Sequence, residues 1–189
     1  VCLSLTATTH SMKLRVGLVG LGGAWENRYR TALLSLADRF QVQAVCTPVS
    51  VRAEQVARDL GATVIDGYRA MTIRSDIDAI LMLAPDWYGP LPILAACEAG
   101  KAIYCAAALD IDPQQAIEVR EKVDVSGVAF MAEFARRHAP ATLRLKELIV
   151  TRLGAPRLLF CHHRLQTSNK PHKQRYALPH PSVTRDLIE

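Results

Sequence analysis

The chain has 189 residues, of which 50% are hydrophobic and 22% are charged, so it can bury one full domain core but hardly two large ones. It has no apolar run of transmembrane length, and we expect a soluble protein without a membrane partner. The net charge of +5 comes from residues 151–189, with 7 basic and 2 acidic side chains. A nucleic-acid surface could explain this excess, but without a binding motif we favour an incomplete segment whose acidic partners are absent.

Residues 1–12 have no basic start and only a weak apolar stretch. This pattern predicts an extension or disordered leader rather than a signal peptide.

The five cysteines are odd in number and lack C-x-x-C spacing. They predict reduced thiols in a cytoplasmic protein.

The sequence then shows the opening pattern of a dinucleotide-binding βαβ unit. The apolar run LRVGLV predicts a strand, and the turn GLGGA precedes a helical pattern that continues to about residue 37. Glycines let the backbone approach a pyrophosphate, so we expect Gly20, Gly22, Gly23 and Ala24 to bind NAD or NADP. Trp25 occupies the third glycine position of G-x-G-x-x-G, where its indole should displace the helix or close over the turn. A tight turn without a nucleotide is the alternative.

Strands and helices alternate after this unit. The pattern predicts strands over 42–46, 62–65, 77–83, 102–105 and 128–131, and helices over 51–60, 91–99 and 113–123. Apolar strands between amphipathic helices indicate an α/β fold, a Rossmann-like doubly wound parallel sheet. Ligands bind such sheets at the carboxyl ends of the strands, so we also assign Thr47, Arg52, Ala84, Pro85 and Asp86 to the cofactor site.

The pattern changes near residue 133, where a helix over 143–149 and a strand over 157–165 are expected. We interpret 13–132 as the dinucleotide-binding domain and 133–189 as the incomplete beginning of an α+β C-terminal domain. Unpaired strand edges and apolar faces there would need a partner, which predicts a homo-oligomer. Four histidines within 162–181 match no metal-site spacing, and we expect no metal.

Four segments carry a family resemblance: GLGGAW, AVCTP, MLAPDWYGPLPILAACEAGKAIYC and FARRHAPATLRLKELIVTRLGAPR. In this order they resemble the glucose-fructose oxidoreductase, inositol dehydrogenase and MocA (Gfo/Idh/MocA) family over roughly residues 13–189. The resemblance implies an N-terminal Rossmann domain with tightly bound NAD or NADP. It also implies a C-terminal domain on a large open β-sheet, and a sugar-like or polyol substrate.

The same resemblance implies that the catalytic groups are missing. The family's Glu-Lys-Pro, whose lysine assists proton transfer, stands here as Ala106-Ala107-Ala108. Gly89 replaces the histidine of the Pro-Asn/Asp-x-x-His turn, and the Asp-x-x-x-His element that begins at Asp186 stops before its histidine. A methyl group cannot donate a proton, so we expect a catalytically degenerate member with no catalytic residue.

Three further positions bear on cofactor binding and catalysis. Thr47 stands where an acidic residue would hold the ribose hydroxyls, and Arg52 either faces a 2′-phosphate, which would favour NADP, or is a solvated helix residue. Cys105 is more consistent with a buried strand thiol than with a nucleophile, because no base is predicted beside it.

Two functional hypotheses follow. The first is an NAD(P)-dependent oxidoreductase that acts on a polyol through residues not identified by the resemblance. The second is a non-catalytic relative that binds a nucleotide, sugar or protein partner as a regulatory protein.

Overall fold

The structure is a computed structural model that describes residues 12–84, 88–106, 111–133 and 135–157. The chain divides into two compact units, Val1–Ala132 and Glu133–Glu189. Within the described part of the chain, no helix is both long enough and apolar enough to span a bilayer.

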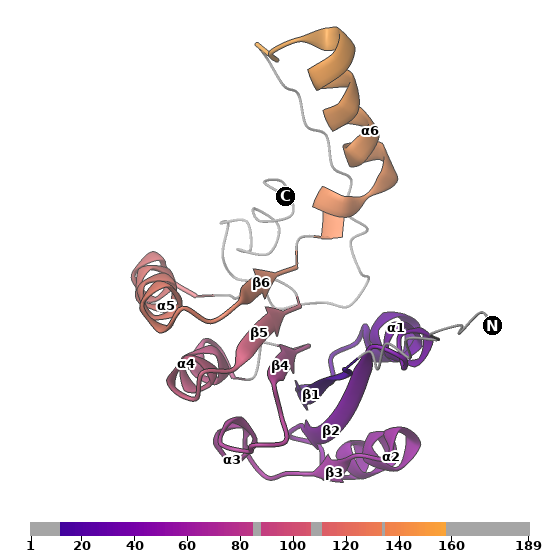
Figure 1. The fold of residues 1–189 in the computed structure, drawn as a ribbon, viewed down its shortest axis with the longest axis vertical. Helices are drawn as coiled ribbons and strands as arrows, with labels where there is room; N and C mark the ends of the chain where they lie inside the picture. Colours follow the sequence, from indigo (N-terminus) through magenta and orange to yellow (C-terminus); the bar gives the residue numbers. More distant parts are fainter. Residues whose placement is uncertain (1–11, 85–87, 107–110, 134, 158–189) are drawn as a thin grey trace, which may run out of the picture. The chain divides into compact units, whose positions relative to one another are not determined.

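The first unit contains a six-stranded sheet in the order β3-β2-β1-β4-β5-β6, with all neighbours parallel (Figure 1). Its strands are β1 (Leu14–Val19), β2 (Phe40–Cys46), β3 (Thr63–Val64), β4 (Ala79–Met82), β5 (Ala102–Cys105) and β6 (Phe130–Ala132). The strand order reverses between β1 and β4, which is where doubly wound sheets bind ligands. The predicted doubly wound parallel sheet is therefore confirmed.

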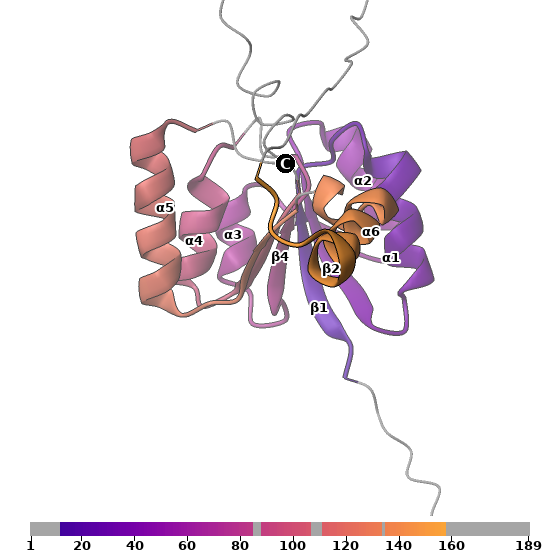
Figure 2. The same cartoon turned by 90° about the horizontal axis from the view of Figure 1, so that it is seen from above.

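Helices lie on both faces of this sheet. They are the π-helical turn η1 (Trp25–Tyr29), α1 (Arg30–Ser35), α2 (Ser50–Leu60), α3 (Tyr68–Thr72), α4 (Leu91–Glu98) and α5 (Pro113–Ser126). α1 and α2 lie on one face, and α3, α4 and α5 on the other (Figure 2). Gly61 and Gly127 end α2 and α5 in the left-handed conformation, and the Asp112 side chain caps α5.

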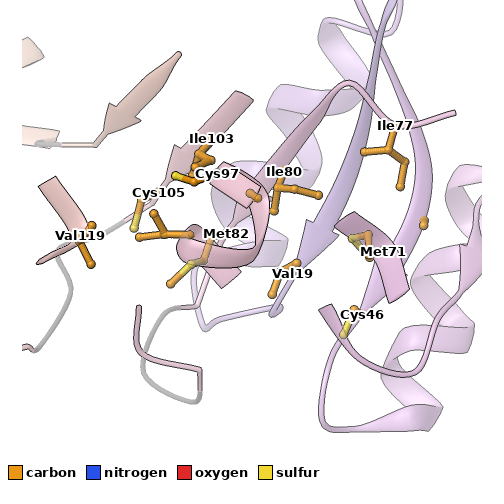
Figure 3. Packing of buried hydrophobic residues seen from close by; sticks show 13 residues of the cluster. Val19, Cys46, Met71, Ile77, Ile80, Met82, Cys97, Ile103, Cys105 and Val119 are labelled. Carbon is orange, nitrogen blue, oxygen red and sulfur yellow. The ribbon is translucent and has the colours of Figure 1, made fainter. Parts of the chain in front are cut away.

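The core on the α3–α5 face depends on a glycine in the central strand. Figure 3 shows Ile80, Met82 and Ile103 of β4 and β5 gathered with buried residues of the neighbouring helices. A Cβ atom at Gly17 of β1 would collide with the side chain of Met71 from α3. Gly17 therefore leaves room for the Met71 side chain of α3, a helix that the sequence pattern did not predict.

Trp25 fills the core on the opposite face. Its side chain is fully buried in a cluster that includes Leu18, Val45 and Leu83. The indole thus does not close over the glycine turn, and the helix that it starts opens with a π-helical turn instead of a regular α-helical one. Within the described residues the indole N–H has no hydrogen-bond acceptor.

Charged side chains hold the amino ends of the strands. Arg15 at the start of β1 pairs with Asp78 just before β4, at 2.6 Å between Nη2 and Oδ1. The Lys101 ammonium, just before β5, donates to the carbonyl oxygens of Arg74 at 2.9 Å and Ile77 at 2.7 Å. Lys101 therefore has a structural role. It stabilises the loop before β4 at the amino edge of the sheet, opposite to the ligand-binding edge.

The described part of the second unit is helical. It contains the 3-10 helix η3 (Ala135–His138), the helix α6 (Pro140–Leu148) and the π-helical turn η4 (Ile149–Leu153). An ion pair between Arg144 and Glu147, at 2.7 Å, stabilises α6 along its own surface. The strand expected over 157–165 lies outside the described residues except for Arg157, so the predicted domain assignment stays a prediction.

Replacing Trp25 with alanine should destabilise the first unit by about 3–5 kcal/mol, because it leaves a cavity where a large side chain was fully buried. Trp25→Phe should cost clearly less, since it keeps most of the ring and removes a buried N–H that has no acceptor. Urea unfolding followed by circular dichroism measures both changes. Equal losses in the two variants would contradict the buried position of the indole.

The ion pair of Arg15 with Asp78 should make stability depend on pH. Hydrogen bonds from Arg15 lower the pKa of Asp78 to about 2. A carboxylate with a lowered folded-state pKa stabilises the fold above its unfolded pKa, and this contribution is lost as the pH falls through the folded-state value. Asp78→Asn should therefore have a lower urea midpoint at neutral pH, and the difference should shrink between about pH 4 and pH 2. A difference that does not change with pH would argue against this pair.

Candidate functional site

A pocket of about 270 Å³ lies at the carboxyl ends of β1, β2 and β4. The residues that line it come from the turn after β1, the loop and helix after β2, and the end of β4. They are Gly20, Leu21, Gly22, Gly23, Thr47, Pro48, Val49, Arg52 and Ala84. The pocket lies where the strand order reverses, the position at which doubly wound sheets hold a nucleotide.

The glycine turn packs closely against the end of β4. Gly20 has a φ of 73°, and a Cβ atom there would lie 2.9 Å from the Ala84 carbonyl oxygen. A Cβ atom at Gly22 would lie 3.1 Å from the Leu83 carbonyl oxygen. The Gly20 amide also donates to the Cys46 carbonyl at 2.8 Å, which ties the turn to the end of β2. Side chains at these positions would push the turn out of place.

The same turn leaves amide groups available for an anion. In the part of the chain that the structure describes, the N–H groups of Gly22 and Gly23 have no acceptor. A Cβ atom at Gly23 would meet no protein atom within 4 Å, so the backbone there borders open space. Adjacent unpaired amides form a positively polarised cradle that suits a phosphate group. The turn therefore fits the pyrophosphate of a dinucleotide.

Arg52 brings a cation to this pocket. It lies in the first turn of α2, is half-buried, and its Nη2 atom donates to the Gly22 carbonyl oxygen at 3.2 Å. Of the two alternatives that the sequence left open, the geometry favours a role at the pocket over that of a fully solvated helix residue. Thr47, directly after β2, contributes a neutral side chain to the same pocket.

Three other predicted cofactor residues are not among the residues that line this pocket. Ala24 does not line the pocket, because it begins the helical turn and its carbonyl accepts the Arg28 amide at 3.0 Å. Pro85 and Asp86 lie outside the described residues. Three pocket residues were not predicted, although they are sequence neighbours of predicted ones: Leu21, Pro48 and Val49.

The end of β5 is apolar where the resemblance implies a catalytic motif. The Ala106 amide donates to the Met82 carbonyl at 2.8 Å, and its methyl group is fully buried in the cluster that contains Trp25. Ala107 and Ala108 lie outside the described residues. Cys105 is 1% exposed and lies within the core, as expected for a structural strand cysteine.

Tyr88 is an ionisable residue near the carboxyl end of β2 that the sequence analysis did not single out. Its hydroxyl lies 3.7 Å from the Cys46 Sγ atom, and its ring meets Tyr68 edge-on at 5.8 Å between centroids. Burial, with the contact to Cys46, raises the pKa of Tyr88, so the phenol stays protonated at neutral pH and cannot act as a base. Gly89 follows it with a φ of 53°, a conformation that side chains rarely adopt.

The predicted histidine tract cannot be placed as a site, since 162–181 and Asp186 lie outside the described residues. Over 12–84, 88–106, 111–133 and 135–157, no group of three or more His, Cys, Asp and Glu side chains could hold a metal ion. Among the described residues that line the pocket, backbone amides and the Arg52 guanidinium are the groups suited to an anion.

A family model described as an oxidoreductase family with an NAD-binding Rossmann fold matches residues 14–134. Inositol 2-dehydrogenase 3 from Saccharopolyspora erythraea is 29% identical over 161 residues, which cover 82% of this chain and 46% of the relative. Two solved structures are similar. Myo-inositol 2-dehydrogenase from Lactobacillus plantarum has a TM-score of 0.67 and 25% identity, over 74% of this chain and 41% of the other. An NAD-binding oxidoreductase from Klebsiella pneumoniae has a TM-score of 0.63 and 29% identity, over 74% and 39%.

The chain spans about half the length of the curated relatives it matches.

Replacing Gly20 with alanine should destabilise the first unit, because its positive φ costs a side-chain-bearing residue about 1–2 kcal/mol and its Cβ would press on Ala84. The matched control is Gly23→Ala, whose Cβ would enter open space and whose φ is not in the left-handed region. Thermal unfolding should show a clearly lower midpoint for the first variant alone. Similar midpoints for both would mean that the turn does not pack as described.

Proposed function

Because the chain belongs to the Gfo/Idh/MocA oxidoreductase family, with its NAD-binding Rossmann fold, we propose that it is a catalytically degenerate member. It binds NAD or NADP at the glycine turn and no longer transfers hydride to or from a substrate. The observation that carries this proposal is the contrast between the two parts of the site. The backbone cradle of the turn is intact, whereas the end of β5 presents a buried methyl group.

The surroundings of Ala106 support the loss of the Glu-Lys-Pro motif. A glutamate at this position would place its carboxylate in the apolar cluster that contains Trp25 and Leu83. Burying a charge without a partner is costly, so the present core suits alanine and not the family's acidic residue.

Lys101 does not replace the missing lysine. It precedes β5, whereas the family motif follows β5, and the four residues of this strand separate the two ends by roughly 13 Å. Both of its described hydrogen bonds go to main-chain carbonyls at the amino edge of the sheet. A hydride transfer from an alcohol needs a group that accepts the hydroxyl proton at the reacting carbon, and Lys101 is not positioned for it.

When bound, the nicotinamide cofactor would supply the hydride acceptor or donor. This chain's residues would hold the pyrophosphate at Gly22 and Gly23 and enclose the adenosine side with Thr47, Pro48 and Arg52. Binding through backbone amides survives the loss of side-chain chemistry, because it needs the turn's shape and not a particular side chain.

The ligand class follows from the relatives' names. Relatives named inositol 2-dehydrogenase suggest a polyol or sugar-like molecule as the second ligand. We also propose a cytoplasmic location, from the buried reduced thiols Cys46 and Cys97, and a homo-oligomer. The biological role that fits these features is a regulatory protein that senses a nucleotide, sugar or protein partner.

The 189-residue chain should bind NAD(H) or NADP(H) in calorimetric titrations and yet form no reduced cofactor with myo-inositol or with a panel of other polyols and sugars. The absorbance of the reduced nicotinamide measures turnover, and Gly20→Ala serves as a control with a distorted binding turn. Gain of activity in Ala107→Lys would support the loss of chemistry at this position. Turnover by the wild-type chain that disappears in Gly20→Ala would show that the proposal of degeneracy is wrong.

A further inference from the structure

We propose that the pocket prefers NADP(H) to NAD(H), and that Arg52 determines this specificity by binding the 2′-phosphate of the adenosine ribose. The inference rests on the proposed function, in which the pocket holds the adenosine half of a dinucleotide. It goes beyond that function because either cofactor would fit the glycine turn alone.

The loop after β2 lacks the group that selects NAD. In dinucleotide-binding domains an acidic side chain near the end of the second strand accepts hydrogen bonds from the ribose hydroxyls and repels a 2′-phosphate. Here Cys46 ends β2 and is followed by TPVSVR, which contains no acidic residue. Glu54, the first acidic residue after β2, lines a different pocket together with Gly61 and Val64. The charge that discriminates against NADP is therefore missing.

Arg52 supplies the opposite charge in the same place. Among the described residues no carboxylate forms an ion pair with its guanidinium, and its one recorded side-chain hydrogen bond goes to the Gly22 carbonyl. A guanidinium has five N–H donors in a planar fork that matches a phosphate, so most of its donors stay available. A half-buried cation that no carboxylate of the described residues compensates, at the pocket, suits a dianionic phosphate.

The bond from Arg52 to Gly22 also positions this cation in advance. It joins the first turn of α2 to the glycine turn, so the two loops that would enclose the ribose are already linked. A side chain that is already ordered loses less conformational entropy when it binds its ligand. The first turn of α2 contains no acidic residue, so the start of this eleven-residue helix also favours an anion.

The experiment is a set of calorimetric titrations of the full 189-residue chain with NADPH, NADH, adenosine 2′,5′-bisphosphate and 5′-AMP. Wild type should bind NADPH at least tenfold more tightly than NADH. Arg52→Gln should weaken NADPH binding roughly tenfold to a hundredfold and NADH binding much less, because the hydrogen bond to Gly22 is lost for both cofactors whereas the contact to the 2′-phosphate is lost for NADPH alone. Arg58→Gln, which removes an exposed arginine from the same helix, is the matched control and should behave as wild type.

Two further variants keep the test decisive if Arg52→Gln folds poorly, as judged by circular dichroism. Arg52→Lys keeps the charge and should retain part of the preference. Thr47→Asp introduces the missing carboxylate and should shift the preference towards NADH. An unchanged preference in Thr47→Asp, with Arg52→Lys equal to wild type for both cofactors, would overturn the assignment.

The remaining outcomes separate this inference from the proposed function. If wild type binds NADH as tightly as NADPH, or more tightly, the preference is wrong although nucleotide binding stands. If Arg52→Gln weakens the binding of both cofactors equally, Arg52 only stabilises the glycine turn and does not recognise the 2′-phosphate. If wild type binds neither cofactor nor the adenosine fragments, the proposed function fails and the preference fails with it.

Discussion

Close packing between the glycine turn and the end of β4 determines how the site is built. Gly20 and Gly22 lie so near the carbonyl groups of Ala84 and Leu83 that a Cβ atom at either position would crowd them. This contact holds the Gly22 carbonyl where Arg52 can donate to it. Three segments that are distant in the sequence thus meet at one edge of the sheet, and the pocket is the space that they leave.

The two edges of the sheet use their side chains differently. The amino edge holds its charges in fixed pairs, with Arg15 bound to Asp78 and Lys101 bound to two carbonyls. The carboxyl edge relies on unpaired amides and on Arg52, whose charge has no described partner. The charged pairs that stabilise the fold therefore lie at the opposite edge of the sheet from the pocket, and a fold of this kind can persist when groups at the pocket edge change.

The sequence predicted the elements whose signals are local. Gly61, Gly127 and Asp112 mark helix ends through their own backbone or side-chain preferences, and the apolar runs gave the strands to within a few residues. It missed the five-residue helix α3, which is too short to show a helical period and which contacts the core through Met71, near Gly17, far away in the sequence. It also did not predict where the Trp25 side chain lies. The two predicted positions, against a displaced helix or over the glycine turn, did not include the core in which the indole is buried.

The shared cluster of Trp25 and Ala106 bears on how this chain could change over generations. In the present chain, glycine at position 25 would empty a filled core, and glutamate at position 106 would bury a carboxylate in the cluster that contains the indole. Either substitution alone should therefore lower stability. A change at one of these positions would be tolerated only together with changes in the rest of the cluster, so the two positions are expected to vary together.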